Sequence, residues 1–473
     1  MGDNYTRIGS YNLAKFFFVN ILIVLFSVAA GENLTLLSIA SVIQLVLCVN
    51  LVYKSTKTLI SLGPIFIILI FLFHSGYTYL LLWGRPLSMI SSVSIPSYIK
   101  AQIFTQLCLM SITLGYVNNY KRIRLKKRVV NYDIKLITRI VTLVFLISFP
   151  VKAYCSIIFE IQVVYSDGYL AVFEAYNTPF LRLLNLIQEF CLPSFLLMMV
   201  LSKDKKQFVS ICFILVVLML AAGMFSGRRS VAICNLLAVF LMYFTVVKTI
   251  SKKEILIYLS LAFLMLTILP VINTMRSLQG DNGAGISMEL AKAAGDLNED
   301  LEIPFSSFFK EFGGSVLSLY SVMDLFSRLG DFHYNMGLSY VLSPFNAVPK
   351  VRMWFDNIEL YHNSLFYVDF LRSYPEYRHI QYGGSILGEL YYNFGWFGFL
   401  FIFFVGKFVA YVDKLLSSLR NNNAVSLFAL FVILSLPRII FWPRDYYSSL
   451  YAGLYLIFYI FIFIFLRKKR QIS

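Results

Sequence analysis

Long apolar runs recur along almost the whole chain, and they limit its possible folds more than any other feature. An α-helix that crosses the ~30 Å hydrocarbon core of a bilayer needs about 20 apolar residues. Twelve runs approach this length, and they cover residues 13–30, 34–53, 59–83, 98–117, 136–158, 181–201, 208–225, 231–247, 255–272, 386–408, 424–441 and 447–466. The sequence therefore predicts an all-α polytopic membrane protein with about twelve transmembrane helices.

The spacing of these runs divides the chain into three parts. We predict an N-terminal bundle of about nine helices in residues 1–272, a long hydrophilic segment in residues 273–385, and about three further helices in residues 386–473. A segment of this length between spans is usually either functional or disordered.

The composition of the long segment favours order. Three stretches are too aromatic for a disordered linker, and they cover Phe305–Phe312, Leu317–Leu329 and Leu338–Phe345. The middle stretch places apolar residues at helical spacing. We therefore predict short amphipathic helices that lie over the outer ends of the spans.

The basic residues predict the orientation of the helices, because cytoplasmic loops of membrane proteins are enriched in lysine and arginine. If the N-terminus is cytoplasmic, every inner connection is basic: Lys54 and Lys57, the run 121–128, Lys203 to Lys206, Lys248 to Lys253, Lys414 with Arg420, and the tail 467–470. Both termini are then cytoplasmic and the long segment is external. The net charge of +16 does not indicate nucleic-acid binding, because the basic residues are scattered between apolar runs.

One short turn departs from this rule. The stretch MFSGRRSVAICN places Arg228 and Arg229 side by side in a turn that the topology puts outside. Arginine predominates over lysine in the other outer segments too. Because a guanidinium matches phosphate oxygens in a bidentate manner, such residues suit an anionic lipid-linked ligand. Alternatively, they pair with lipid headgroups or with acidic residues of the outer segment such as Asp324.

Candidate catalytic groups occur in and after the long segment. A neutral histidine near a bound phosphate can act as a general base toward a sugar hydroxyl, and His362 and His379 lie near the return to the membrane. Glu389 enters an apolar run, where a carboxylate is costly unless it is paired or functional. The alternatives are surface histidines without a role and a structural pairing of Glu389 with an arginine. His74, inside the third run, is interpreted as a hydrogen-bonded packing residue.

No part of the sequence predicts a metal site. The six cysteines all lie in or beside apolar runs, without the Cys or Cys/His spacing of a metal centre. The last outer turn, FWPRDYYSSLYAG, holds Arg444 and Asp445 next to each other. These opposite charges either neutralise each other or leave Arg444 to bind substrate.

At SGRRS, GGSILGELYYNFGWFG and PRDYYSSL the sequence resembles the O-antigen (Wzy-type) polymerase family. The resemblance implies a glycosyltransferase with a GT-C-like multispan fold and one large periplasmic loop. It implies undecaprenyl-pyrophosphate-linked oligosaccharides as donor and acceptor, no metal or other cofactor, and an action at the periplasmic face of the bacterial inner membrane. By analogy with the family, a chain-length regulator protein is a possible partner.

The resemblance also implies a set of substrate-binding arginines. Family members use arginines of outer loops, which correspond here to Arg228, Arg229, Arg276 of NTMRS and Arg444 of PRDYY; Arg378, beside His379, belongs to the same outer set. The residues agree with this chemistry, because a diphosphate leaving group needs cations that stabilise its developing charge.

Two other functions fit the same layout. An O-antigen ligase-like glycosyltransferase shares the spans, the large outer loop and the outer arginines, and YHNSL around His362 slightly favours it. A flippase for lipid-linked oligosaccharides would have related halves and charges at mid-membrane depth. We find no internal repeat and one long loop, which argues against the flippase.

Overall fold

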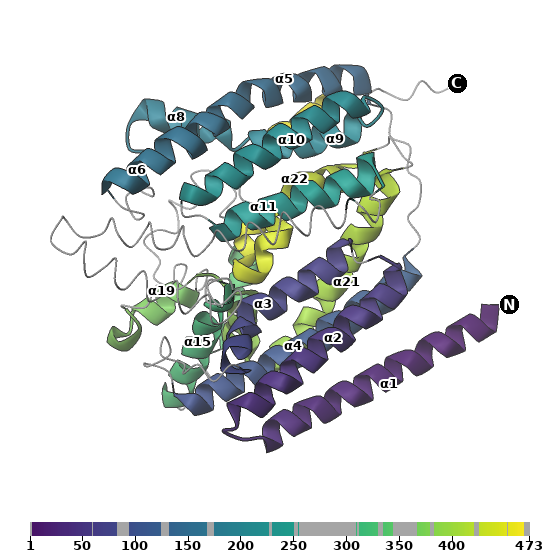
Figure 1. Ribbon diagram of the computed structural model, residues 1–473, viewed down its shortest axis with the longest axis vertical. Coiled ribbons are helices and arrows are strands. Elements are labelled where there is room, and N and C mark those ends of the chain that lie inside the picture. The colour runs from purple at the N-terminus through teal and green to yellow at the C-terminus, as the bar shows by residue number, and fades with distance from the viewer. Residues whose placement is uncertain are drawn as a thin grey trace. The chain divides into compact units, whose positions relative to one another are not determined.

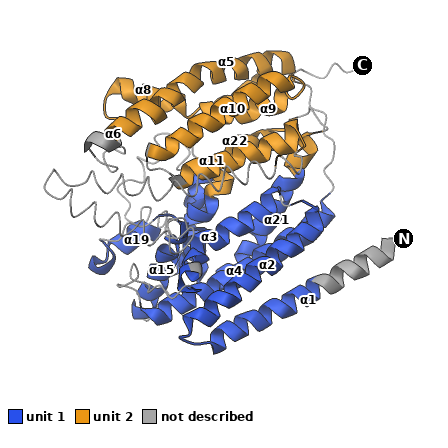
Figure 2. Cartoon of the chain, in the orientation of Figure 1, with its two compact units in different colours: residues 1–124, 309–414, 442–452 blue, residues 125–308, 415–441, 453–473 orange. Residues whose placement is uncertain are grey.

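The computed structural model describes residues 2–58, 60–82, 94–123, 132–167, 175–226, 229–249, 254, 309, 312–329, 334–343, 367–378, 383–420, 425–451 and 453–467. For residues 2–12, 79, 164–167, 226, 229 and 451 only the backbone is described. The chain forms two compact units, each built from three segments of the sequence (Figures 1 and 2). Unit 1 comprises residues 1–124, 309–414 and 442–452, and unit 2 the remainder.

Unit 1 begins with four helices that pack side by side (Figure 1). They are α1 (Gly2–Ala29), α2 (Leu34–Thr56), α3 (Leu62–Leu82) and α4 (Ile95–Arg122). α2 contacts α1, α3 and α4. Asn33 caps α2, since its Oδ1 accepts a hydrogen bond from the Leu36 N–H at 3.1 Å.

Buried amides join three of these helices. The Gln44 amide donates to Asn20 Oδ1 at 3.0 Å and to the Gln106 carbonyl at 2.9 Å, and the Gln106 amide donates to Ser41 Oγ at 3.0 Å. Hydrogen bonds of this kind hold transmembrane helices together where no hydrophobic driving force acts between them. They also explain why α4, which covers the predicted span 98–117, is less apolar than its neighbours.

The rest of unit 1 comes from the centre and the end of the chain. Its elements are α15 (Val316–Leu329), α16 (Leu338–Leu342), α19 (Tyr367–Arg372), η6 (Pro375–Tyr377), α20 (Ile386–Phe394), η7 (Gly395–Phe397), α21 (Gly398–Leu419, whose residues 415–419 belong to unit 2), η8 (Trp442–Arg444) and η9 (Tyr447–Tyr451). α15 and α16 confirm the helices predicted at 317–329 and 338–345. α15 is more deeply buried than an amphipathic surface helix, because ten of its 14 residues are buried against α4, α20, α19 and α3.

Unit 2 is a second group of packed helices (Figure 2). Its elements are α5 (Ile134–Ala153), η2 (Tyr154–Phe159), α6 (Glu160–Asp167), α8 (Pro179–Gln188), α9 (Cys191–Leu201), α10 (Lys206–Ala222), η3 (Gly223–Ser226), α11 (Arg229–Met242), η4 (Tyr243–Val247), α22 (Leu427–Phe441) and α23 (Leu454–Phe465). α5 packs on α8 and α9, while α11 packs on α10 and α22.

The composition of the helices confirms the prediction of an all-α membrane protein. Eight helices of the described residues are long and apolar enough to cross a membrane, and they cover 34–56, 62–82, 134–163, 179–201, 206–225, 230–247, 386–419 and 427–444. Two shorter apolar helices cover 13–29 and 454–465. The described residues contain no β-strand. Predicted span 98–117 coincides with α4, which is not among these helices. Predicted span 255–272 lies outside the described residues, and both the number of twelve spans and the GT-C-like character stay predictions.

Apolar side chains on several helices are exposed in a way that suits a lipid environment. Ile211, Ile214 and Leu218 of α10 are 59%, 56% and 61% exposed. Apolar surface of this extent is unusual on a soluble protein. The predicted twelfth span begins later than expected, because residues 447–451 form the 3₁₀ turn η9 and α23 begins at Leu454, after Gly453 with φ 150°.

Candidate functional site

The site in unit 1 is built on the first turn of α20. Ser385 caps this helix, and its Oγ accepts a hydrogen bond from the Gly388 N–H at 2.9 Å. The Glu389 N–H donates to the Ser385 carbonyl at 2.9 Å, which closes the first helical turn. Because Ser385 is the last polar residue before an apolar run, the sequence itself favours a helix start at this position.

A histidine of α3 holds the Ser385 hydroxyl. His74 is completely buried; its Nδ1 lies 3.0 Å from the Ile70 carbonyl and its Nε2 lies 2.7 Å from Ser385 Oγ. Since a carbonyl only accepts, the hydrogen-bond partners assign the proton to Nδ1, and Nε2 then accepts from the Ser385 hydroxyl. The Gln102 amide donates to the His74 carbonyl at 2.7 Å. These contacts confirm that His74 is a hydrogen-bonded packing residue.

Glu389 is a carboxylate of the protein interior. It is 2% exposed, and its Oε2 accepts a hydrogen bond from the Tyr447 N–H at 3.0 Å. Among the described residues, no arginine or lysine forms an ion pair with it. The hydrogen bond between the Tyr447 N–H and Glu389 links the first turn of α20 to the chain that follows Arg444.

The turn that carries Arg444 packs tightly on the residues before α20. The Asp445 N–H donates to the Trp442 carbonyl at 2.9 Å, which forms the turn of η8. The Arg444 guanidinium carbon lies 5.7 Å from the centre of the Phe73 ring, within the range of a cation–π contact. A Cβ atom on Gly384 would lie 2.8 Å from Asp445 Cα. Gly384 therefore allows a backbone approach that a larger residue would prevent.

Gly384→Ala tests this close approach. We expect the methyl group to push the Arg444 turn away from α20, with a loss of about 1–3 kcal/mol in stability, as for other overpacked interiors, and a loss of polymerisation. Gly383→Ala is the matched control, because its Cβ would meet its nearest atom, Arg444 Nε, at 3.8 Å. Thermal unfolding and glycan synthesis of both purified variants check this prediction. Equal behaviour of the two would contradict it.

Tyrosines surround Glu389 and the Arg444 turn. Tyr447 packs edge-on against Tyr340 at 5.3 Å between ring centroids, and Tyr446 against Tyr367 at 5.7 Å. Burial raises the pKa of Tyr447, and the negative charge of Glu389 raises it further. Burial likewise raises the pKa of Tyr446 and of Tyr367. These phenols therefore stay protonated and can act as hydrogen-bond donors.

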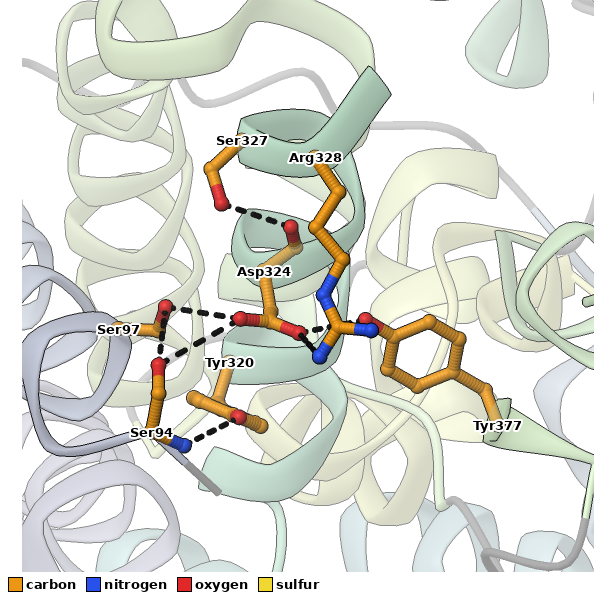
Figure 3. Close-up of polar contacts among 7 residues, drawn as sticks. All are labelled: Ser94, Ser97, Tyr320, Asp324, Ser327, Arg328 and Tyr377. Atoms are coloured by element: carbon orange, nitrogen blue, oxygen red, sulfur yellow. Dashed lines mark hydrogen bonds and ion pairs between the residues drawn. The ribbon is translucent and has the colours of Figure 1, made fainter. Parts of the chain in front are cut away.

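A second polar cluster in unit 1 centres on Asp324 of α15 (Figure 3). The Asp324 carboxylate is bound by Tyr377 OH at 2.6 Å, by Arg328 Nη2 at 2.7 Å and by Ser97 Oγ at 3.1 Å. The carboxylate charge raises the pKa of Arg328. Burial and the hydrogen bond to Asp324 raise the pKa of Tyr377, which keeps the phenol protonated as the donor. The cluster joins α15, the start of α4 and the 3₁₀ turn η6.

The predicted site residues fall into two groups. Glu389 and Arg444 lie in the two segments that the Tyr447 contact joins, and Arg378 is exposed directly after the anchored Tyr377. Arg228, Arg276, His362 and His379 lie outside the described residues, and of Arg229 only the backbone is described, at the start of α11.

Two arginines of the long central segment have different partners. Arg328 pairs with Asp324, which confirms for this arginine the pairing with an acidic residue of the outer segment. Arg372 Nη1 lies 3.9 Å from Asp369 Oδ1, at the limit of an ion pair, and both side chains are well exposed. The sequence also holds six cysteines, all buried with free thiols.

Sequence reasoning missed the residues that support the site. Ser385 carried a signal as a helix cap before an apolar run, but nothing indicated its partner His74, 311 residues earlier in the chain. Asp324 carried a signal as a charge within a helix-like apolar pattern. Tyr447 contributes its backbone N–H, which no side-chain pattern predicts.

The apolar helices define a multi-pass membrane protein, and unit 1 brings a buried carboxylate and an arginine turn together within it. A family model for the O-antigen polysaccharide polymerase Wzy matches residues 13–471, nearly the whole chain. The chain belongs to the O-antigen polysaccharide polymerase Wzy family. No curated protein and no solved structure matches it.

Family membership confirms the resemblance of the short motifs. The protein is a membrane glycosyltransferase that polymerises O-antigen repeat units and acts on lipid-linked oligosaccharides. This favours the polymerase over the ligase-like enzyme and the flippase, which share the general layout of spans and outer loop.

Proposed function

We propose that the protein polymerises undecaprenyl-diphosphate-linked repeat units at the periplasmic face of the bacterial inner membrane, with both termini in the cytoplasm. The observation that carries the proposal is the buried Glu389 carboxylate, which the Tyr447 N–H holds beside the turn of Arg444. The Glu389 carboxylate can accept a proton, and the Arg444 guanidinium can bind a phosphate. Glycosyl transfer from a lipid diphosphate needs both.

In this mechanism a sugar hydroxyl of the acceptor attacks the anomeric carbon of the donor. The new glycosidic bond forms while the bond from that carbon to the diphosphate oxygen breaks. Glu389 accepts the hydroxyl proton as general base. Arg444 stabilises the negative charge that develops on the departing diphosphate, a role that requires no metal ion. The protonated phenols of Tyr446 and Tyr447 donate hydrogen bonds to substrate oxygens.

The remaining predicted residues extend this assignment. We propose that Arg228, Arg229, Arg276 and Arg378 bind diphosphate or anionic parts of the substrate through their guanidinium groups. His362 and His379 are alternative general bases. Glu389 is preferred over both histidines because the described contacts join it to an arginine turn.

Arg444→Ala tests the role of the arginine. We expect polymerisation by the purified protein to fall by about 10²–10³-fold, as when a single oxyanion donor is removed. Arg444→Lys restores only part of the activity, since a point charge lacks the planar fork. Arg122→Ala, at the far end of α4 in the same unit, is the control and should retain full activity.

The cellular readout uses a host that lacks the gene. Complementation by wild type should restore the ladder of surface glycans, and Arg444→Ala should leave the core with a single repeat. An Arg444→Ala protein that restores the full ladder at normal expression would remove Arg444 from the site. Complete loss of the glycan on gene deletion would indicate a ligase or a flippase.

A further inference from the structure

A lysine lies inside one of the apolar spans of unit 2. Lys152 is in the last turn of α5, two residues after Pro150, within the candidate membrane span Ile134–Val163. Its Nζ donates to Gln188 Oε1 at 3.1 Å, and no carboxylate of the described residues forms an ion pair with it. A charge at such a position is costly and usually marks a functional site.

The hydrogen-bond partner of Lys152 is a neutral amide and not a carboxylate. The Gln188 amide donates to Asn185 Oδ1 at 2.7 Å and to Tyr176 OH at 3.2 Å, which fixes the amide with its oxygen toward Lys152. The Tyr176 hydroxyl in turn donates to Glu160 Oε1 at 2.9 Å. The buried Glu160 carboxylate thus accepts a hydrogen bond from the Tyr176 phenol, while the Lys152 ammonium donates to the neutral Gln188 amide.

The backbone at this end of the span is also unusual. The chain passes from α5 into the π-helix η2, and single π-helical turns within α-helices are frequent at functional sites. η2 and α6 contact the 3₁₀ turn η3, and a Cβ atom on Gly223 would lie 3.7 Å from Ser156 Cβ. η3 ends at Ser226 and α11 begins at Arg229. Lys152 therefore directly precedes the part of unit 2 that contacts η3, the turn at the end of α10.

We propose that Lys152 binds a phosphate group of the lipid-linked diphosphate substrate. The inference rests on the proposed function, because it names a further cation for the lipid-linked diphosphate. Lys152 is half-buried, so it keeps an accessible side, and Gln188 aligns its ammonium group. An ordinary anionic phospholipid headgroup offers the same phosphate chemistry, and the experiment separates the two.

The test measures binding of sugar-free undecaprenyl diphosphate to the full-length protein in phosphatidylcholine nanodiscs. Lys152→Gln should weaken binding about tenfold, the effect of losing one charge-assisted hydrogen bond. Lys152→Arg should bind within about threefold of wild type, since it keeps the charge. Lys203→Gln is the matched control, because Lys203 is also half-buried in unit 2 but donates to the carbonyls of Leu419 and Arg420.

Gln188→Glu provides a second test that keeps the lysine in place. The new carboxylate would lie opposite Lys152 Nζ and neutralise it, so binding should again weaken about tenfold while the fold is retained. This variant decides the matter if Lys152→Gln does not fold. Wild-type affinity in Gln188→Glu or in a folded Lys152→Gln protein would overturn the proposal.

Competition with phosphatidylglycerol distinguishes the two sources of phosphate. The proposal requires that an excess of phosphatidylglycerol does not displace undecaprenyl diphosphate from wild type; complete displacement would assign Lys152 to ordinary headgroups and overturn it. Binding needs no polymerisation. If the wild-type protein polymerises and the Lys152→Gln protein binds undecaprenyl diphosphate normally, only this inference is refuted. If binding depends on Lys152 but the wild-type protein does not polymerise, only the proposed function is refuted.

Discussion

Glu389→Gln protein is expected to fold normally and to lose polymerisation almost completely. The amide oxygen still accepts the Tyr447 N–H, but an amide cannot accept the proton of the attacking sugar hydroxyl. Removal of a general base typically lowers turnover by about 10²–10⁴-fold. Turnover by purified protein on lipid-linked repeat units, with the unfolding temperature measured alongside, checks this result. We expect KM to change little.

Asp413→Asn is the matched control for this variant. Asp413 is 2% exposed on α21 of the same unit, where it accepts hydrogen bonds from the Tyr116 hydroxyl and the Gly63 N–H. Its replacement should lower stability but leave turnover per folded molecule near wild type. If Glu389→Gln also turns over within about threefold of wild type, far from a catalytic loss, the base must be sought elsewhere, with His362 and His379 as the next candidates.

Asp324→Ala is expected to cause the largest loss of stability among single polar substitutions in unit 1. It leaves the Tyr377 hydroxyl and Ser97 without their acceptor in a buried position (Figure 3). Each unsatisfied buried group costs about 1–3 kcal/mol, and we expect a total of about 3 kcal/mol. The ion pair itself adds little, because the Arg328 side chain is 54% exposed. Thermal unfolding in detergent measures the effect.

Asp369→Ala separates this effect from the loss of a surface ion pair. Asp369 Oδ1 lies 3.9 Å from Arg372 Nη1, and the side chains of Asp369 and Arg372 are 43% and 50% exposed. Exposed pairs contribute about 0–1 kcal/mol, so the unfolding midpoint should hardly move. Similar midpoints for Asp324→Ala and Asp369→Ala would mean that the buried cluster does not support α15.

The sequence predicts the elements of this protein better than their contacts. Apolar runs of about 20 residues determine where helices can cross a membrane, and helices occur at most of the predicted positions. The helix at Val316–Leu329 was also predictable, from the spacing of its apolar residues. Its depth of burial was not, because a periodic pattern gives the period of a helix and not the number of neighbours around it.

The candidate site shows the same limit. Glu389 and Arg444 were predictable because a charge within or beside an apolar run is costly and needs a reason. The contact that joins their segments runs through the backbone N–H of Tyr447, a group that every residue except proline carries. The partnership of His74 with Ser385 spans 311 positions, and a single sequence contains no signal for such a pairing.

The assembly of unit 1 from three separate segments affects how the protein is made. His74 enters the membrane long before its partner, because 311 positions separate it from Ser385, and a ribosome needs roughly 15–60 s to add them at about 5–20 residues per second. Over that time, His74 Nε2 lacks its native partner, the Ser385 hydroxyl. On the proposed assignment of Glu389 and Arg444, a chain that ends before the Arg444 turn lacks part of the site and cannot act on substrate.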